Sequence, residues 1–213
     1  MNFIFVFFVC ILANISGLEA KTSCPDCYLK GKISSTDKRY VTFFRALDLI
    51  TERGAKVLVE TGTARNGSRN CAGDGCSTVI FANWAKANNA ILYSVDIDKN
   101  ALKNASGALQ RKQKPFVCFV QSDSVTFLEN FGTPIDFLYL DSYDFEIENP
   151  APSQQHHLRE IQAAYPYLHD KTLVMIDDCD LPYGGKGPLV VEYLLERDWV
   201  ILEKGYQILM GKM

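Results

Sequence analysis

Short apolar runs alternate along the chain with longer stretches in which apolar positions recur at helical spacing. The apolar runs have the length of strands, and they cover residues 57–60, 91–96, 116–121, 135–140 and 173–176. The periodic stretches predict helices over residues 40–50, 77–86, 99–112, 124–131, 154–168 and 188–197. Strands that are separated by helices predict βαβ units and a mostly parallel sheet. Residues 199–210 instead predict two antiparallel strands around Lys204 and Gly205.

This order predicts one α/β domain over residues 34–213. We expect a mostly parallel sheet with helices on both faces and an antiparallel hairpin at its C-terminal end. No internal repeat or linker interrupts residues 34–213. Residues 21–33 are interpreted as a leader that contains Cys24 and Cys27 in a Cys-Pro-Asp-Cys motif. These two cysteines fit either a tight disulfide in an oxidising compartment or a surface pair in a flexible leader.

The first twenty residues differ from the rest of the chain. Residues 3–13 form an unbroken apolar run of eleven residues, and no charge precedes Glu19. This length is typical of a signal peptide and short for a membrane span. Cleavage after Ala20 predicts a secreted or periplasmic protein. Because no Lys or Arg precedes the run while several follow it, the alternative is an uncleaved N-terminal anchor with the body in the cytoplasm.

Composition narrows the class of protein. Apolar residues make up 47% of the chain and charged residues 22%, which suits a folded domain and excludes a disordered chain. Seven cysteines are too few and too scattered for a small disulfide scaffold. The net charge is −3, so the basic excess that indicates a nucleic-acid partner is missing.

A carboxylate stands at or directly after the end of every strand of the predicted parallel sheet. In chain order these residues are Glu60, Asp96, Asp123, Asp141 with Asp144, and Asp177 with Asp178. Asp is common at turns and helix caps, but five acidic strand ends in register are hard to explain as caps alone. Because ligands bind beyond the carboxyl ends of parallel strands, we expect these side chains to meet along one edge of the sheet.

The first two strand ends together indicate a cofactor site. Gly62 would let a ligand approach the backbone, and Asp96 would accept hydrogen bonds from a ribose diol. That pair suits either a dinucleotide or an adenosyl cofactor. The loop after Gly62 has neither the Gly-x-Gly-x-x-Gly fingerprint nor a P-loop, so no pyrophosphate cradle is visible. The acidic Glu60 favours a cationic ligand, and a cofactor with an amino group and a sulfonium meets that condition.

Two segments, Val57–Thr63 and Gly75–Thr78, resemble motif I of the class I S-adenosylmethionine-dependent methyltransferases. Within that superfamily, Leu140-Asp141 and Ile176-Asp177-Asp178 resemble the metal-binding strand ends of divalent-cation-dependent O-methyltransferases of the macrocin type. The resemblance covers residues 34–210. It implies the Rossmann-like class I methyltransferase fold, S-adenosylmethionine as cofactor, and methyl transfer to a hydroxyl of a small molecule or sugar.

The resemblance also implies roles for particular residues. The expected cofactor-binding residues are Glu60, Gly62, Thr63, Ser77, Asp96 and Asp123. Asp141, Asp177 and Asp178 would hold Mg²⁺, because carboxylates and waters make the all-oxygen site that this ion prefers. Asp144 and His156, with the adjacent His157, are the candidates for a catalytic base. In an alternative that stays open, Lys186 neutralises the three carboxylates and makes the metal unnecessary.

Two other functions remain as hypotheses. A nicotinamide (NAD)-dependent oxidoreductase would also use Gly62 and Asp96, but the dinucleotide fingerprint is missing. A catalytically inactive, secreted methyltransferase-like binding module would explain the leader, because the methyl donor is made in the cytosol. The sequon Asn66-Gly-Ser68 lies in the proposed cofactor loop, where a glycan would block binding.

Overall fold

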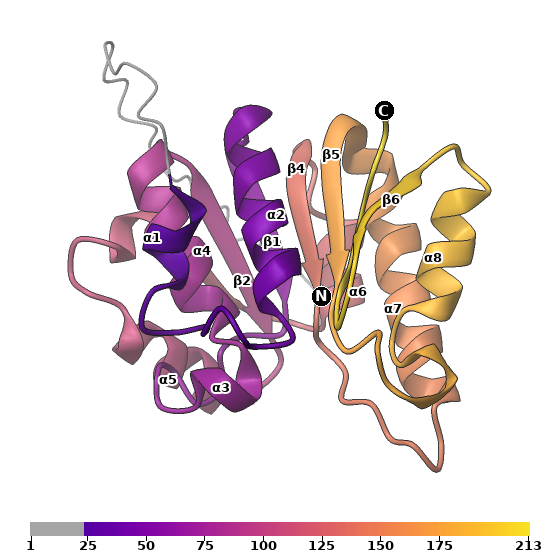
Figure 1. Ribbon diagram of the computed structural model, residues 1–213, viewed down its shortest axis with the longest axis horizontal. Helices are drawn as coiled ribbons and strands as arrows, with labels where there is room; N and C mark the ends of the chain where they lie inside the picture. The colour runs from indigo at the N-terminus through magenta and orange to yellow at the C-terminus, as the bar shows by residue number, and fades with distance from the viewer. Residues whose placement is uncertain (1–23) are drawn as a thin grey trace, which may run out of the picture.

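The computed structural model describes residues 24–213, which form a seven-stranded sheet with helices around it (Figure 1). The strands are β1 (Val57–Thr61), β2 (Ile91–Asp96), β3 (Val117–Gln121), β4 (Ile135–Leu140), β5 (Leu168–Ile176), β6 (Val200–Lys204) and β7 (Ile208–Gly211). Their order in the sheet is β3-β2-β1-β4-β5-β7-β6. Strands β1 to β5 pair in parallel, whereas β7 runs antiparallel to both β5 and β6. The predicted parallel sheet with an antiparallel C-terminal pair is confirmed.

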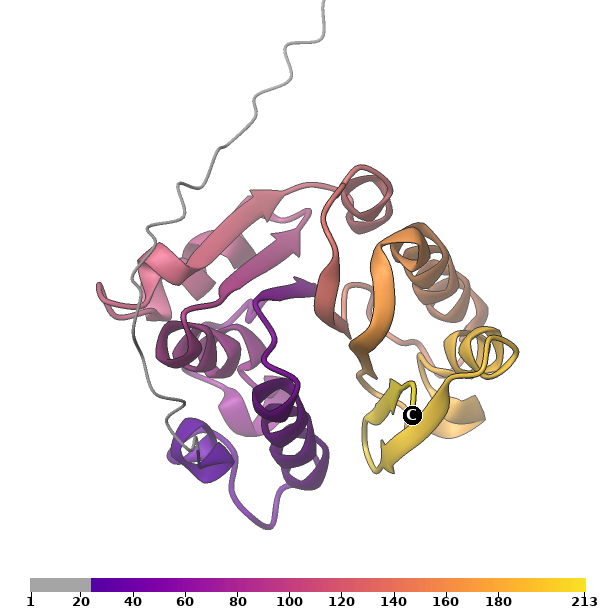
Figure 2. The ribbon, with the colours of Figure 1, turned by 90° about the horizontal axis from the view of Figure 1, so that it is seen from above.

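Helices cover both faces of this sheet, as Figure 2 shows from above. The α-helices are α1 (Pro25–Leu29), α2 (Tyr40–Glu52), α3 (Cys71–Asp74), α4 (Ser77–Asn88), α5 (Lys99–Ala108), α6 (Ser124–Glu129), α7 (Ala151–Ala164) and α8 (Pro188–Leu195). One hydrophobic core joins the sheet to α1, α2 and α4, and a second joins it to α6, α7 and α8. Helix α5 packs against β2 and β3.

The sequence of β4 shows why two cores form. Phe137 and Tyr139 are buried in the first core, and Leu138 and Leu140 are buried in the second. Side chains alternate between the two faces of a strand, so a strand covered on both faces needs an apolar residue at nearly every position. The continuous apolar run that predicts this strand therefore also indicates its central place in the sheet.

The strand order reverses at β1, which lies between β2 and β4. The chain leaves β1 toward α4 on one face and leaves β4 toward α7 on the other face. The two loops therefore diverge at the carboxyl ends of these strands. Such a reversal is where ligands bind in open α/β sheets.

Several boundaries differ from those that the sequence predicts. Strand β5 begins at Leu168 instead of residue 173, because it runs on through a polar stretch that carries no strand pattern. Helix α7 begins at Ala151 instead of residue 154, with a proline in its first turn, where no backbone N–H is needed. Helix α5 ends at Ala108 instead of residue 112, and the short helices α1 and α3 were not predicted.

Residues 24–33, which the sequence assigns to a leader, pack against the domain. Helix α1 contacts α2 and α4, and Leu29 and Ile33 are buried in the first core. Cys24 and Cys27 in this segment are free and exposed.

Two findings concern the cysteines and the membrane. Cys71 and Cys76 form a disulfide that encloses α3.

No helix within residues 24–213 is long and apolar enough to cross a membrane. The predicted signal peptide or anchor, residues 1–20, lies outside the described residues.

Candidate functional site

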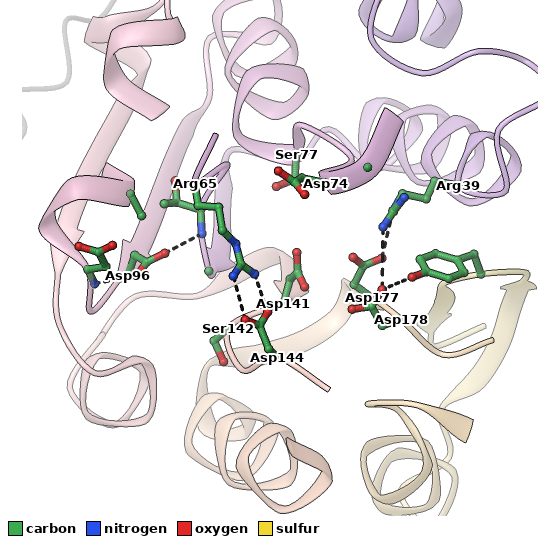
Figure 3. Close-up of a pocket in the computed structure, with 16 residues that line it drawn as sticks. Arg39, Arg65, Asp74, Ser77, Asp96, Asp141, Ser142, Asp144, Asp177 and Asp178 are labelled. Carbon is green, nitrogen blue, oxygen red and sulfur yellow. Dashed lines mark hydrogen bonds and ion pairs between the residues drawn. The ribbon is translucent and has the colours of Figure 1, made fainter. Parts of the chain in front are cut away.

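Two adjoining cavities open at the carboxyl ends of the strands. The first, which we call the acidic cavity, has a volume of about 350 Å³ (Figure 3). Its charged residues are Asp74, Asp96, Asp98, Asp141, Asp144, Asp177 and Asp178, with Arg39 and Arg65. The second, the apolar cavity, has a volume of about 280 Å³. Gly62, Asp96 and Ser142 line both cavities, so the two meet at the ends of β1, β2 and β4.

Gly62 makes the chain turn sharply after β1. Its φ angle is +81°, and a Cβ atom at this position would overlap the backbone carbonyl of Asp141. Its N–H donates a hydrogen bond to the carbonyl of Val95 on β2, at 2.8 Å. A side chain would therefore force apart the loops that follow β1 and β4. The sequence indicates the need for glycine, but the backbone that approaches Gly62 is that of Asp141.

Asp96 fixes the same loop from the end of β2. One carboxylate oxygen accepts the N–H of Thr63 at 3.1 Å, and the other accepts the N–H of Asp98 at 2.8 Å. The Thr63 hydroxyl lies 3.0 Å from that of Thr78 and 2.9 Å from that of Ser94. Burial raises the pKa of Asp96 in spite of its two backbone hydrogen bonds. Three expected cofactor residues, Gly62, Thr63 and Asp96, thus come together around the acidic cavity.

Ser77 and Glu60 differ in their relation to this cavity. Ser77 lines it from the first position of α4. Glu60 is fully buried and lines neither cavity. Its Oε1 accepts a hydrogen bond from the Ser94 hydroxyl at 2.6 Å, and burial raises its pKa to about 7. The structure therefore does not place Glu60 in the lining, where the sequence analysis expects it to meet a ligand amino group.

Asp123 and His156 both line the apolar cavity. Asp123 also caps α6, since its Oδ1 accepts the N–H of Thr126 at 2.9 Å. His156 Nε2 lies 3.0 Å from the Ser124 hydroxyl, and its ring centre lies 5.3 Å from that of Tyr143. Asp123 thus lies in the lining of a cavity, as expected for a residue that contacts the cofactor. Of the two cavities, His156 lines the apolar one, and its role as the base stays a prediction.

Asp144 is paired with Arg65 at the acidic cavity (Figure 3). The guanidinium donates two hydrogen bonds to the carboxylate, at 2.8 and 2.5 Å, and these bonds lower the pKa of Asp144. A carboxylate with a lowered pKa and both oxygens bonded is a weak base, so the predicted catalytic role is not supported. The pair instead joins the loop after β1 to the loop after β4. The other candidate, His157, is fully buried, and burial lowers its pKa to about 4.

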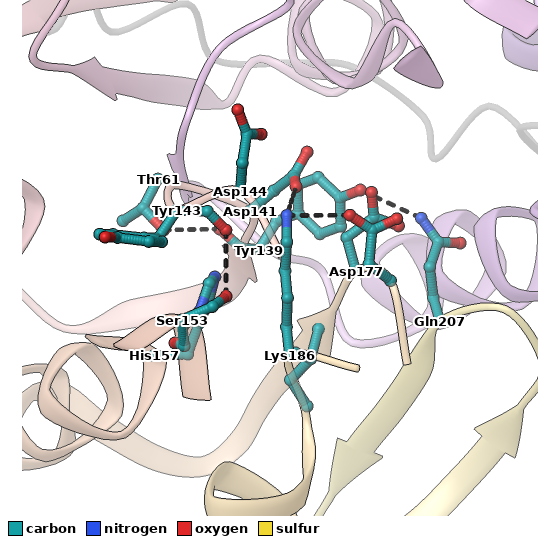
Figure 4. A network of polar contacts seen from close by, with 12 residues as sticks. Thr61, Tyr139, Asp141, Tyr143, Asp144, Ser153, His157, Asp177, Lys186 and Gln207 are labelled. Atoms are coloured by element: carbon teal, nitrogen blue, oxygen red, sulfur yellow. Dashed lines mark hydrogen bonds and ion pairs between the residues drawn. The ribbon is translucent and has the colours of Figure 1, made fainter. Parts of the chain in front are cut away.

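Asp141, Asp177 and Asp178 come together at the ends of β4 and β5. Each offers a carboxylate oxygen within 4.8 Å of the others. The Lys186 ammonium, however, lies 2.5 Å from Asp141 Oδ1 (Figure 4) and 3.1 Å from Asp178 Oδ2. Two of the three carboxylates thus already bind a cation of the chain itself. The arrangement does not fit a divalent ion held by all three, and it matches the alternative in which Lys186 neutralises them.

Arg39 is a site residue that the sequence analysis missed. It precedes α2, and its guanidinium lies 3.8 Å from Asp177 and 3.9 Å from Asp178 while packing on the ring of Tyr206. Arg39 Nε and Nη1 and Asp177 Oδ1 are buried without a hydrogen-bond partner. Nothing in the local pattern separates Arg39 from a surface arginine, because its partners lie far along the chain.

Asp74 is a second site residue that was missed. It ends α3 within the loop between β1 and α4, and it lines the acidic cavity. The side-chain amides of Asn66 and Asn70 donate hydrogen bonds to its carboxylate, at 2.6 and 3.0 Å. The Gly- and Asn-rich composition of this loop signals a turn and gives no sign that one of its carboxylates faces a ligand cavity.

The order of the strands is that of the Rossmann-like fold of class I methyltransferases. Solved methyltransferase structures have the same fold. The chain belongs to the methyltransferase domain family, whose model matches residues 72–179. No curated protein matches the chain significantly.

Three solved structures illustrate the shared fold. NSun6 from Pyrococcus horikoshii, crystallised with SFG, is 15% identical over 75% of this chain and 48% of its own, with a TM-score of 0.58. MycE of the mycinamycin biosynthetic pathway, crystallised with Mg and SAH, is 14% identical over 89% of this chain and 53% of its own, with a TM-score of 0.58. An rRNA methylase from Streptococcus thermophilus is 13% identical over 80% of this chain and 95% of its own, with a TM-score of 0.53. This chain thus spans about half the length of NSun6 and MycE.

Proposed function

We propose that this protein transfers the methyl group of S-adenosylmethionine to a hydroxyl oxygen of a small molecule or sugar. The observation that carries the proposal is the pair of cavities that meet at Gly62 and Asp96. The apolar cavity, with Ile97 and Tyr143 in its lining, suits an adenine ring. The acidic cavity suits the cationic amino and sulfonium groups of the same molecule, because its seven carboxylates outnumber the two arginines that line it and the Lys186 ammonium that two of them bind.

The reaction follows from the chemistry of a sulfonium. The acceptor oxygen would attack the methyl carbon in line with the carbon–sulfur bond. That bond breaks, S-adenosylhomocysteine leaves, and the hydroxyl proton passes to water. Such a step depends on the alignment of two bound molecules. Arg39 and Asp177 carry buried polar atoms without partners in the lining of the acidic cavity, and a hydroxyl bound between them would satisfy both.

The charge of the cavity also favours a small acceptor over RNA, although RNA methylases are among the similar structures. A polynucleotide would bring phosphates toward the carboxylates of the acidic cavity, and the net charge of the chain is −3. The same repulsion disfavours the diphosphate of NAD. No divalent cation is part of the proposal, because Lys186 already binds Asp141 and Asp178.

We further propose that the protein acts in an oxidising compartment, reached through the N-terminal apolar run. The disulfide between Cys71 and Cys76 supports this, because structural disulfides persist mainly in such compartments.

Calorimetric titration with S-adenosylmethionine and with NAD tests the cofactor. We expect binding of the first and none of the second. Asp96→Ala should lower the affinity for S-adenosylmethionine about 10- to 100-fold, because the ribose hydroxyls lose a charged acceptor. Asp170→Ala is the matched control, since that carboxylate is exposed and pairs with Lys212. Tighter binding of NAD, or unchanged affinity in a folded Asp96→Ala variant, would refute the assignment.

A further inference from the structure

The loop between β5 and α8 carries a lysine into the interior. Gly185 has a φ angle of +58°, and a Cβ atom there would overlap the carbonyl of Asp178. The N–H of Lys186 donates to that same carbonyl at 3.2 Å. A Cβ atom at Gly187 would lie 2.6 Å from the sulfur of Cys179. The glycines on both sides of Lys186 thus let the loop fold tightly back on the end of β5.

The side chain of Lys186 is fully buried, which is rare for lysine. Its ammonium bonds to Asp141 at the end of β4, as Figure 4 shows. It also bonds to Asp178, just beyond the end of β5. The ammonium thus lies between two carboxylates, which favour its charged form.

The charges of the side chains in this cluster disfavour the binding of a divalent cation in addition to the Lys186 ammonium. Asp141, Asp177 and Asp178 carry at most three negative charges, and Lys186 with Arg39 supplies two positive charges. A divalent cation among these side chains would make the cluster net positive in a buried setting, which is unfavourable. It would also have to share the carboxylates of Asp141 and Asp178 with the ammonium that they already bind.

We propose that the Lys186 ammonium is the resident cation of this site and takes the place of a divalent metal ion. It fixes the carboxylates of two neighbouring strands, as a bound ion would, but it is tethered to the chain and cannot dissociate. Chelators would then have no effect on the site. The inference rests on the proposed function only in placing the cluster beside the acceptor, and its test is metal binding, which is independent of methyl transfer.

The test uses Mn²⁺, followed by electron paramagnetic resonance and thermal unfolding, in the full chain. Wild-type protein should bind no Mn²⁺ at the cluster, and EDTA should leave its melting temperature unchanged. Lys186→Met leaves three carboxylates without their main cation, so it should bind one Mn²⁺ and unfold at a higher temperature when Mn²⁺ is present. Asp178→Asn added to Lys186→Met should weaken that binding at least tenfold. Lys212→Met, which removes a partly exposed lysine far from the cluster, should behave as wild type.

Two results would overturn the proposal. One is a Mn²⁺ site in the wild-type protein that Asp178→Asn removes. The other is a folded Lys186→Met variant that binds no Mn²⁺. If Lys186→Met does not fold without metal, we expect refolding in Mn²⁺ to restore its structure. If it folds in neither condition, the Mn²⁺ titration of the wild-type protein decides whether the proposal holds. The affinity of wild-type protein for S-adenosylmethionine, measured in the same samples, tests the proposed function separately.

Discussion

Glu60 places an acidic group inside the sheet. It lies on β1, fully buried, where the Ser94 hydroxyl donates to it. Its pKa of about 7 exceeds the ordinary value of 4.5 because burial disfavours the charged form. Between pH 4.5 and 7 the folded state therefore holds a proton that the unfolded chain has released. The contribution of this proton to the free energy of unfolding is fully present below pH 4.5, and it is lost as the pH rises through 7.

Glu60→Gln should remove this pH dependence, because an amide does not titrate. We expect the variant to gain stability relative to wild type as the pH rises from 5 to 8, by on the order of 2–3 kcal/mol. Urea unfolding at both pH values measures the difference between the two proteins. The comparison cancels the contribution of the other buried carboxylates, which both proteins share. Equal pH profiles for the two proteins would show that Glu60 is not protonated in the folded state.

At the scale of elements, the segment between β1 and α4 shapes the rim of the acidic cavity. The disulfide between Cys71 and Cys76 encloses α3, and Gly73 and Asp74 within it line the cavity. Helix α3 has only four residues, too few to hold a helix by its own hydrogen bonds. The cross-link therefore fixes the position of Asp74 at the rim of the acidic cavity.

Removal of this cross-link should loosen the rim and lower the stability of the domain. For so short a loop, the chain-entropy estimate is about 2 kcal/mol. We expect Cys71→Ala with Cys76→Ala to lower the free energy of unfolding by that amount and to abolish its response to a phosphine reductant. Replacement of both exposed cysteines, Cys24→Ser with Cys27→Ser, is the control and should change little. A double alanine variant as stable as the oxidised wild type would argue against a structural role.

At the scale of the whole molecule, the core reaches beyond the α/β domain that the sequence outlines. Leu29 in α1 is 1% exposed, and it lies in the core cluster that α2, α4 and the sheet share. Residues 24–33 are thus part of the folded unit. Pro25, Leu29 and Ile33 are buried, and α1 contacts both α2 and α4.

Leu29→Ala tests this connection. We expect a loss of about 2–5 kcal/mol of unfolding free energy, as for other buried leucines. Leu195→Ala makes the same change at a residue that is 49% exposed, and it should stay within about 0.5 kcal/mol of wild type. Chemical denaturation of the two variants gives the comparison. Similar small losses in both would mean that α1 is only loosely attached.

The sheet was predictable because its central strands are buried on both faces and read as apolar runs. The start of β5 was not, since His169, Asp170 and Lys171 extend the strand into solvent. Helix α1 was missed because five residues show no helical period.

The residues of the candidate site also fall into those that the sequence predicts and those that it does not. Carboxylates at strand ends were predictable, because parallel strands bring their ends to one edge. The direction of Glu60 and the approach of Arg39 depend on packing between segments that are distant in sequence, so no local pattern encodes them.

The place of β7 affects how the chain matures during synthesis. Residues 208–211 leave the ribosome after the other six strands of the sheet, yet they are hydrogen-bonded between β5 and β6 inside it. Until Gly211 leaves the ribosome, one edge of β5 and one edge of β6 stay open for pairing with other chains. The parallel part of the sheet can assemble on the nascent chain, but its closure waits for these residues. A premature stop codon between the end of β6 and Ile208 would therefore leave a nearly complete domain with an open apolar edge for chaperones and proteases to recognise.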